Sequence, residues 1–147
     1  MMRMLHPPSK ASDETGALPG SGDGLYISVI GGGRCTAPQY AVAEAVGRLI
    51  AGMGAVLVCG GLGGVMEGAA RGAAEAGGRT LAILPGHDRS AANPYMDTVV
   101  TTGLGHARNL LVVSTGDEVI AVGGGYGTLS EIGLGCKIGR LVVVLEG

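Results

Sequence analysis

The chain has 147 residues, of which 46% are apolar and 15% charged, with a formal net charge of −2; this suits one domain with one core and leaves no room for a second sizeable domain. A near-neutral charge with scattered basic residues speaks against a nucleic-acid partner, which would need a concentrated basic surface. The three cysteines follow no metal-binding or disulfide spacing, and no apolar run approaches the roughly 20 residues of a membrane span, so we expect a soluble, cytoplasmic protein with no metal site and no membrane partner.

The first 24 residues differ from the rest of the chain. Residues 1–24 mix prolines, glycines, serines and charges without an apolar period, which predicts a flexible N-terminal leader. Residues 25–30 are then a β-rich run that ends in glycines, and residues 36–53 have the apolar spacing of a helix. Thr36 and Gln39 have the spacing of a capping box at its start. We therefore expect the folded domain to span residues 25–147.

The same strand, glycine and helix unit then repeats along the chain. Residues 55–59 form a second apolar run that breaks into glycines, and a helix rich in alanine and glycine follows from about residue 65 to 76, implying close packing. The remaining expected elements are a strand at 80–84, a polar loop at 87–98, a short strand at 99–102, a helix at about 106–114, a strand at 118–122, a helix at about 129–138 and a strand at 141–145.

Alternating apolar strands and helices predict a single doubly wound α/β domain of the Rossmann-like type, with a mainly parallel sheet and helices on both faces. In such domains ligands bind outside the carboxyl ends of the strands, where the strand order reverses. Three glycine clusters directly follow strands, so we expect them to gather at that edge. Because the last expected element is a strand, we also expect either a truncated C-terminus or a partner over that strand.

The stretch from Val119 to Glu131, VIAVGGGYGTLSE, is the strongest candidate for a ligand site. Glycines between a strand and a helix leave unpaired N–H groups at the positive end of the helix dipole, which predicts a phosphate cradle. Thr128 and Glu131 also have the spacing of a capping box, which would give Glu131 a structural role. No cluster completes the Gly-x-Gly-x-x-Gly pattern of NAD binding, and no Gly-Lys-Ser/Thr phosphate loop is present.

Three motifs, GGLGGVMEGAARGA, GHARN and GGGYGTLSE, resemble those of the LOG-type Rossmann-like family, long misnamed lysine decarboxylases. The best-known members are phosphoribohydrolases that act on cytokinin riboside monophosphates, and the branch most similar to this chain is related to the molybdenum cofactor carrier protein. The family pattern PGGxGTxxE falls on Gly123–Glu131 with glycine in place of the proline. The pattern MHxRK falls on Gly105–Asn109, keeping His106 and Arg108 and replacing methionine and lysine.

The resemblance implies that Arg108 and Glu131 are the catalytic pair if the protein is an enzyme, whereas His106 is interpreted as a supporting or surface residue. The loss of the lysine at Asn109 argues against hydrolysis. The candidate residues for binding a phosphate or the rest of the ligand are Gly32, Gly33, Gly60, Gly61, Gly64, Met66, Arg108, Gly123, Gly124, Gly125, Gly127 and Thr128.

Three functions remain open from the sequence. The first is a protein that binds a nucleotide or a pterin phosphate without converting it; the ligand would be a nucleotide, a phosphate or the molybdenum cofactor, and no further cofactor is required. The second is a phosphoribohydrolase that cleaves the N-glycosidic bond of a nucleoside 5′-monophosphate, and not a lysine decarboxylase. The third is a regulatory scaffold with a vestigial site. In each case we expect a homo-oligomer, either a dimer or a tetramer.

Overall fold

The structure is a computed structural model and describes residues 2–5 and 24–146. Its elements, in chain order, are β1 (Met2–Leu5), β2 (Tyr26–Gly31), α1 (Ala37–Gly52), β3 (Val56–Cys59), α2 (Val65–Glu75), β4 (Arg79–Leu84), the short helix η1 (Arg89–Ala91), β5 (Thr98–Thr101), the short helix η2 (Gly105–Ala107), α3 (Arg108–Thr115), β6 (Glu118–Val122), α4 (Tyr126–Lys137) and β7 (Leu141–Leu145). The predicted capping box of α1 is confirmed, because Thr36 accepts from the Gln39 N–H while the Gln39 side chain accepts from the Thr36 N–H.

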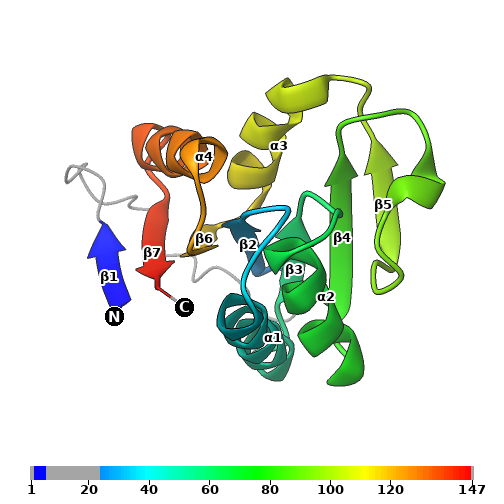
Figure 1. The fold of residues 1–147 in the computed structure, drawn as a ribbon, viewed down its shortest axis with the longest axis horizontal. Helices are drawn as coiled ribbons and strands as arrows, with labels where there is room; N and C mark the ends of the chain where they lie inside the picture. The colour runs from blue at the N-terminus through cyan, green and yellow to red at the C-terminus, as the bar shows by residue number, and fades with distance from the viewer. Residues whose placement is uncertain (1, 6–23, 147) are drawn as a thin grey trace.

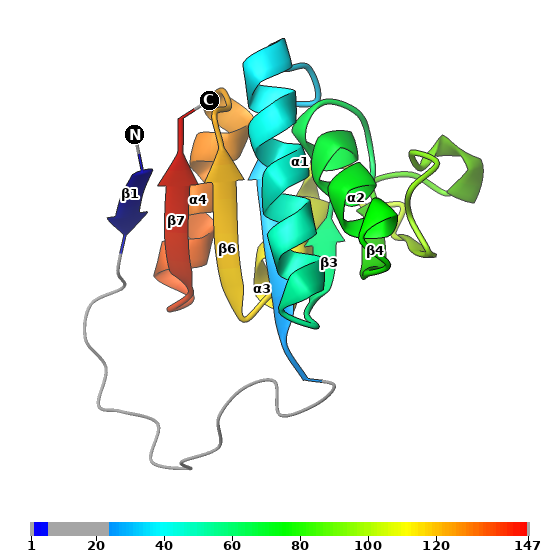
Figure 2. The ribbon, with the colours of Figure 1, turned by 90° about the horizontal axis from the view of Figure 1, so that it is seen from below.

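One seven-stranded sheet carries these elements, in the order β1-β7-β6-β2-β3-β4-β5. All neighbouring strands are parallel except β1, which runs antiparallel to β7; Figure 2 shows the β1 arrow opposed to those of β6 and β7. The order reverses between β2 and β6, since β3, β4 and β5 extend from one side of β2 and β6 and β7 from the other. The predicted doubly wound α/β fold is therefore confirmed.

The strand β1 corrects the interpretation of the N-terminus. Met2 pairs with Leu145 and Leu5 with Val142, so this strand satisfies backbone groups along the outer edge of β7. A flexible leader is wrong for these four residues, because a strand this short owes its structure to a distant partner and not to local periodicity. A partner over the last strand was one of the two alternatives expected for that edge, and in the structure β1 of the same chain pairs with it. The rest of the leader up to residue 23 lies outside the described residues, and there the leader stays a prediction.

Helices cover both faces of the sheet. Figure 1 shows α1 and α2 on one face and α3 and α4 on the other. Two clusters of buried side chains lie between the layers, one built around Val29, Leu57 and Val65 and the other around Ile30, Val119 and Val142. Neighbouring residues of β2 thus belong to opposite clusters, because successive side chains of a strand point to opposite faces. Burial on both faces explains why the strands read as continuous apolar runs.

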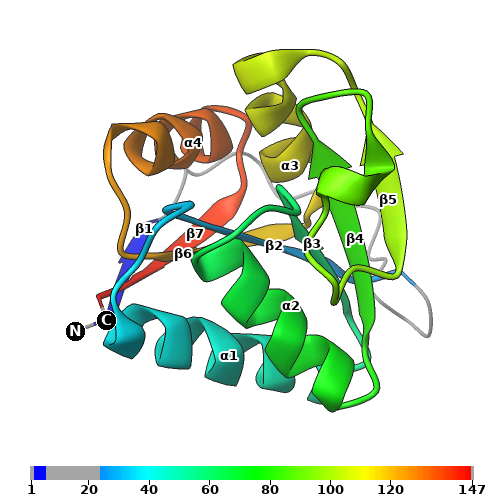
Figure 3. The ribbon, with the colours of Figure 1, turned by 45° about the vertical axis from the view of Figure 1, so that its right-hand side comes forward.

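Glycines bring α1 and α2 into close contact, and the two helices lie side by side in Figures 2 and 3. A Cβ on Gly47 of α1 would overlap the backbone oxygen of Ala69, and a Cβ on Gly72 of α2 would overlap that of Glu44. The close packing expected from the alanines and glycines of α2 is therefore confirmed. This contact fixes the position of α2, whose first turn lies at the candidate site.

The contact between α1 and α2 should make Gly72→Ala destabilising. The added methyl group has to displace the backbone of α1, which we expect to lower the free energy of unfolding by about 1–3 kcal/mol or more, measured by urea denaturation. Gly52→Ala is the matched control, because a Cβ at this last residue of α1 meets nothing within 4 Å. Equal stability of the two variants would contradict this account of the helix contact.

Candidate functional site

Three glycine corners meet at the carboxyl edge of the sheet, where the strand order reverses. They follow β2, β3 and β6, three adjacent strands. A cavity of about 370 Å³ lies between them. Its lining residues are Val29, Ile30, Gly31, Gly32, Gly33, Gly60, Leu62, Met66, His106, Arg108, Asn109, Gly125, Gly127, Thr128 and Glu131. The convergence expected from the sequence is thus present in the structure.

The structure brings most of the predicted site residues to this cavity. Those that line it are Gly32, Gly33, Gly60, Met66, Arg108, Gly125, Gly127, Thr128 and Glu131. Gly123 and Gly124 line a neighbouring depression with Tyr126 and Leu129. Their φ angles are 53° and 112°. The turn from β6 into α4 therefore requires glycine at these two positions because of its backbone conformation.

Gly61 and Gly64 do not line the cavity either. Gly61 has a φ of 78°, and a Cβ there would approach Ala82 and Leu84 of β4 too closely. Gly64 precedes α2 with a φ of 64°, and a Cβ there would overlap the backbone oxygen of Gly32. Both glycines are required by the turn and by packing. They shape the corner without facing the cavity.

The first turn of α4 differs from the predicted capping box. The helix starts at Tyr126 with Gly125 as its N-cap and no side-chain cap, so Thr128 lies inside the first turn. The first backbone hydrogen bond runs from the Leu129 N–H to the Gly125 oxygen, at 3.0 Å. The Tyr126, Gly127 and Thr128 N–H groups precede this bond and have no partner within the helix. The structural interpretation of Thr128 and Glu131 as a capping box is therefore wrong.

The side chain of Arg108 crosses from the start of α3 toward the β3–α2 corner. Its guanidinium occupies the space that a Cβ on Gly60 would need, so a larger residue there would displace the Arg108 side chain. Arg108 is 8% exposed, and no side chain among the described residues pairs with its guanidinium. Burial lowers its pKa, and the nearby acidic groups of Glu131 and Cys59 act to raise it. A buried cation without a partner is a group prepared for an anionic ligand.

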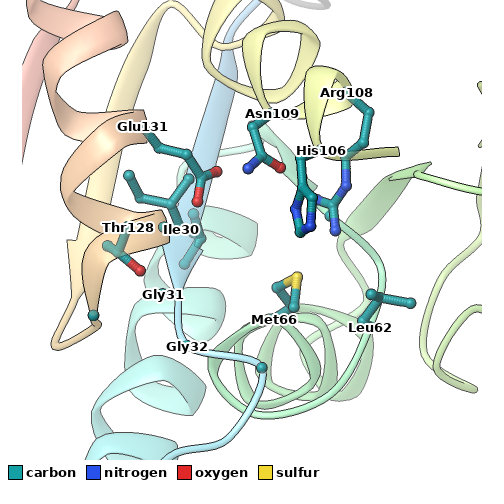
Figure 4. A pocket seen from close by; sticks show the side chains of 15 residues that line it. Ile30, Gly31, Gly32, Leu62, Met66, His106, Arg108, Asn109, Thr128 and Glu131 are labelled. Carbon is teal, nitrogen blue, oxygen red and sulfur yellow. The ribbon is translucent and has the colours of Figure 1, made fainter. Parts of the chain in front are cut away.

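Glu131 faces the cavity from the opposite side. It is 8% exposed, and Figure 4 shows it reaching in from α4 while Arg108 and His106 reach in from the far wall. Burial raises the pKa of Glu131 to about 7, although the charge of Arg108 acts to lower it. No ion pair joins the two side chains within residues 2–5 and 24–146. The cavity therefore holds a guanidinium and a carboxyl group on opposite walls, and the carboxyl group is ionised mainly above about pH 7.

Several lining residues were not predicted as site residues. His106, interpreted as supporting or surface, is exposed and lies at the cavity, and Asn109 was noted only as a departure from the family motif. Gly31 ends β2, where a Cβ would collide with Val65. The signal that could have found Gly31 is its place at the carboxyl end of a strand beside the switch point. Leu62 carries no comparable signal in the sequence.

Metal ligands do not gather anywhere in the described part of the chain: no three His, Cys, Asp or Glu side chains come together there as a metal site would require. None of the helices found there has the length and apolar character needed to span a bilayer.

Comparisons with known proteins agree with this geometry. A family model described as the SLOG cluster4 family matches residues 24–147. An uncharacterized protein of Archaeoglobus fulgidus is 47% identical over 129 residues, which are 84% of this chain and 85% of that protein. The molybdenum cofactor binding protein of the phototrophic bacterium Rippkaea orientalis superposes with a TM-score of 0.82 at 42% identity, covering 84% of this chain and 77% of that one. The molybdenum cofactor carrier protein of Chlamydomonas reinhardtii gives 0.76 at 36%, covering 80% and 74%.

The buried carboxyl of Glu131 should make stability depend on pH. Its pKa of about 7 lies above the reference value of 4.5, so the unfolded chain ionises first as the pH rises. The free energy of unfolding should therefore fall between pH 4.5 and about 7 and level off above. At pH 8 we expect Glu131→Gln to be more stable than the wild type by up to about 3 kcal/mol.

Chemical denaturation across this pH range measures the effect. Glu75→Gln is a matched control, because Glu75 is an exposed residue whose surface ion pair with Arg71 contributes about 1 kcal/mol or less. A wild-type stability that rises from pH 5 to 8 and a Glu131→Gln variant that follows the same curve would contradict the burial of an unpaired carboxyl.

Proposed function

The chain belongs to the SLOG cluster4 family, and from this premise we propose that it binds and carries a phosphorylated pterin or nucleotide without converting it. The observation that supports this best is the convergence on one cavity of three glycine corners, two of which lead into helices without a side-chain cap, and of Arg108, which has no hydrogen-bond or ion-pair partner among the described residues. Backbone N–H groups and a guanidinium bind phosphate well and supply no bond-breaking chemistry by themselves. A carrier needs only such a cradle.

The start of α4 is the proposed phosphate subsite. Its first three N–H groups have no partner within the helix, and the helix dipole adds positive potential at that end. A Cβ on Gly125 or Gly127 would meet nothing within 4 Å, so no packing requirement explains why these lining residues are glycine. Close approach of a ligand to the backbone explains it.

The ligand class follows from the similar structures and from the polar groups of this cavity. The proteins from Rippkaea orientalis and Chlamydomonas reinhardtii are described as binding or carrying the molybdenum cofactor. In this chain Glu131 and Asn109 lie on the cavity wall together and offer the acceptors and donors that the edge of a pterin or purine ring can pair with. Molybdenum would arrive as part of the cargo.

A phosphoribohydrolase is the second candidate, and the buried carboxyl of Glu131 is the observation that favours it. Breaking an N-glycosidic bond builds positive charge on the sugar, which a carboxylate in a cavity stabilises, or the carboxylate activates water. Arg108 would hold the phosphate or orient the carboxylate. Asn109 replaces the lysine that the hydrolase motif carries at this place, which is why we rank binding above cleavage.

Other expectations from the sequence stay predictions. They are a homo-oligomer, a cytoplasmic location and the absence of a nucleic-acid partner. Leu49 of α1 and Met53 directly after it are exposed, which fits a contact between copies of the chain. The mass in solution at micromolar concentration would test this.

Gly127→Ala tests the phosphate subsite with little effect on the fold. Outside its own helix turn the added methyl group meets nothing within 4 Å, and it is added to a residue that lines the cavity beside the unpaired amides. We expect the variant to bind AMP or a phosphorylated pterin about tenfold or more weakly by calorimetry.

Gly133→Ala is the matched control for this substitution. Gly133 lies in the same helix and is exposed, and a Cβ there would meet nothing within 4 Å; the variant should bind as the wild type does. Both substitutions should leave the helix as stable or more stable, by up to about 1 kcal/mol. Unchanged affinity in Gly127→Ala would remove the start of α4 from the site, and failure of every phosphorylated ligand to bind would favour the vestigial scaffold.

Release of a free base from a nucleoside 5′-monophosphate separates the two candidate functions. The carrier proposal predicts that AMP is recovered intact after incubation with the protein, measured by chromatography. Base release that is lost in Glu131→Gln would establish the hydrolase instead. Base release that survives this substitution would exclude Glu131 from the mechanism.

A further inference from the structure

Asn93 contacts the β3–α2 corner from outside the cavity. It belongs to the segment between β4 and β5, which Figure 3 shows beside the start of α2. Its backbone N–H donates to the Gly61 oxygen at 2.8 Å, and its Nδ2 donates to the Leu62 oxygen at 2.9 Å. Its Oδ1 accepts from the Tyr95 N–H at 3.1 Å, which fixes the orientation of the amide. Asn93 thus holds two successive carbonyl groups of the corner.

These two hydrogen bonds also orient the next two N–H groups. In a planar trans peptide the N–H of one residue points opposite to the carbonyl of the residue before it, and the described residues include no cis peptide bond. Because the carbonyls of Gly61 and Leu62 point toward Asn93, the N–H groups of Leu62 and Gly63 point away from it. Asn93 does not line the cavity, whereas Gly60, Leu62 and Met66 do. The two N–H groups therefore lie on the side of the corner away from Asn93, and Leu62 itself lines the cavity.

These N–H groups have no acceptor in the described part of the chain, unlike the N–H groups of Gly61 and Val65 to either side. The Gly61 N–H donates to Cys59 Sγ at 3.4 Å, and the Val65 N–H donates to the Gly32 oxygen at 3.0 Å. Successive unpaired N–H groups in a glycine-rich turn form a concave site for an anion. The corner has this geometry because Asn93 holds its carbonyls outward.

A second, independent feature points to an anion at the same place. The guanidinium of Arg108 lies against Gly60, the first residue of the corner. Arg108 is 8% exposed and has no hydrogen-bond or ion-pair partner among the described residues. Figure 4 shows it directed toward Met66, on the wall opposite Glu131. A largely buried side chain whose guanidinium nitrogens stay open to the cavity, beside unpaired amides, is well placed to bind an anion.

We propose that the β3–α2 corner is a second oxyanion subsite, formed by the N–H groups of Leu62 and Gly63 with Arg108, and that Asn93 is its positioning residue. This rests on the proposed function, since the cavity is the same. The subsite is separate from the start of α4, because β2 lies between β3 and β6 and two strand spacings are about 10 Å. The cavity therefore suits a ligand with an oxyanionic group at each end, either two phosphoryl groups or a phosphate and an oxometal group.

Simultaneous binding of two separate anions tests the second subsite. Molybdate is dialysed to equilibrium against the wild-type protein with and without saturating AMP, and bound molybdenum is measured by mass spectrometry. We expect molybdate to bind one per chain in the presence of AMP. Displacement of AMP by molybdate, one for one, would overturn the second subsite and leave the proposed function standing; failure of both anions to bind would overturn both.

Competition with inorganic phosphate identifies the second group of the ligand. Loss of bound molybdate at an equal concentration of phosphate, with AMP still bound, assigns the subsite to a phosphoryl group. Retention of molybdate assigns it to an oxometal group. Both results support an oxyanion subsite at the β3–α2 corner.

Asn93→Asp isolates the positioning role. The variant keeps the backbone contact to Gly61 and the acceptor for Tyr95 and removes the donor to Leu62. The Leu62 carbonyl is then no longer held outward, so the Gly63 N–H loses its charge-assisted hydrogen bond to the anion. We expect molybdate to bind about 10- to 100-fold more weakly, with AMP affinity unchanged. Ala91→Asp places the same charge on an exposed position of the same segment and should bind both anions normally. Equal loss in both variants, or no loss in Asn93→Asp, would overturn the role of Asn93.

A measurement on the wild type keeps the test valid even if Asn93→Asp fails to fold. Molybdate should shift the amide resonances of Leu62 and Gly63 in a ¹H–¹⁵N spectrum, which a merely structural role of Asn93 would not require. Shifts confined to the start of α4 would overturn the second subsite.

Discussion

Backbone N–H groups at a helix start without a side-chain cap need an acceptor from elsewhere, and α2 and α4 both start this way. The rest of this structure depends on where these two starts meet the glycine corner after β2. The parallel sheet places the carboxyl ends of β2, β3 and β6 side by side. The contact between α1 and α2, set by glycines such as Gly47 and Gly72, fixes one helix start. The cavity is the volume that these constraints leave between the corners.

The charged side chains of the cavity, like its backbone N–H groups, lack partners within the described part of the chain. Arg108 and Glu131 are both buried, yet no ion pair joins them in the described part of the chain. Each charge is therefore costly in the free protein, and the raised pKa of Glu131 shows the cost. A ligand with an anionic group and a hydrogen-bonding ring would compensate both, which favours binding as the function of the site. This is a case of stability given up where a ligand binds.

The sequence predicted the parallel sheet and the glycine corners because both depend on local patterns: apolar runs that end in glycine. The predictions were wrong where the structure of a segment depends on residues far away in the sequence. The strand β1 exists because Met2–Leu5 pairs with β7 at the other end of the chain. The spacing of Thr128 and Glu131 predicted a capping box at the start of α4. The helix instead starts at Tyr126, and both side chains are buried within its first turns. Asn93 was not predicted, since it acts on a corner about 30 residues earlier in the sequence.

The central claim is that uncapped amides of the glycine corners hold the phosphate of the ligand. A crystal structure of the protein with a phosphorylated pterin or AMP tests it most directly. The account predicts phosphate oxygens within hydrogen-bonding distance of the Gly127 and Thr128 N–H groups, with the ring system between Arg108 and Glu131. A ligand bound outside this cavity, or a phosphate that contacts none of these amides, would contradict it.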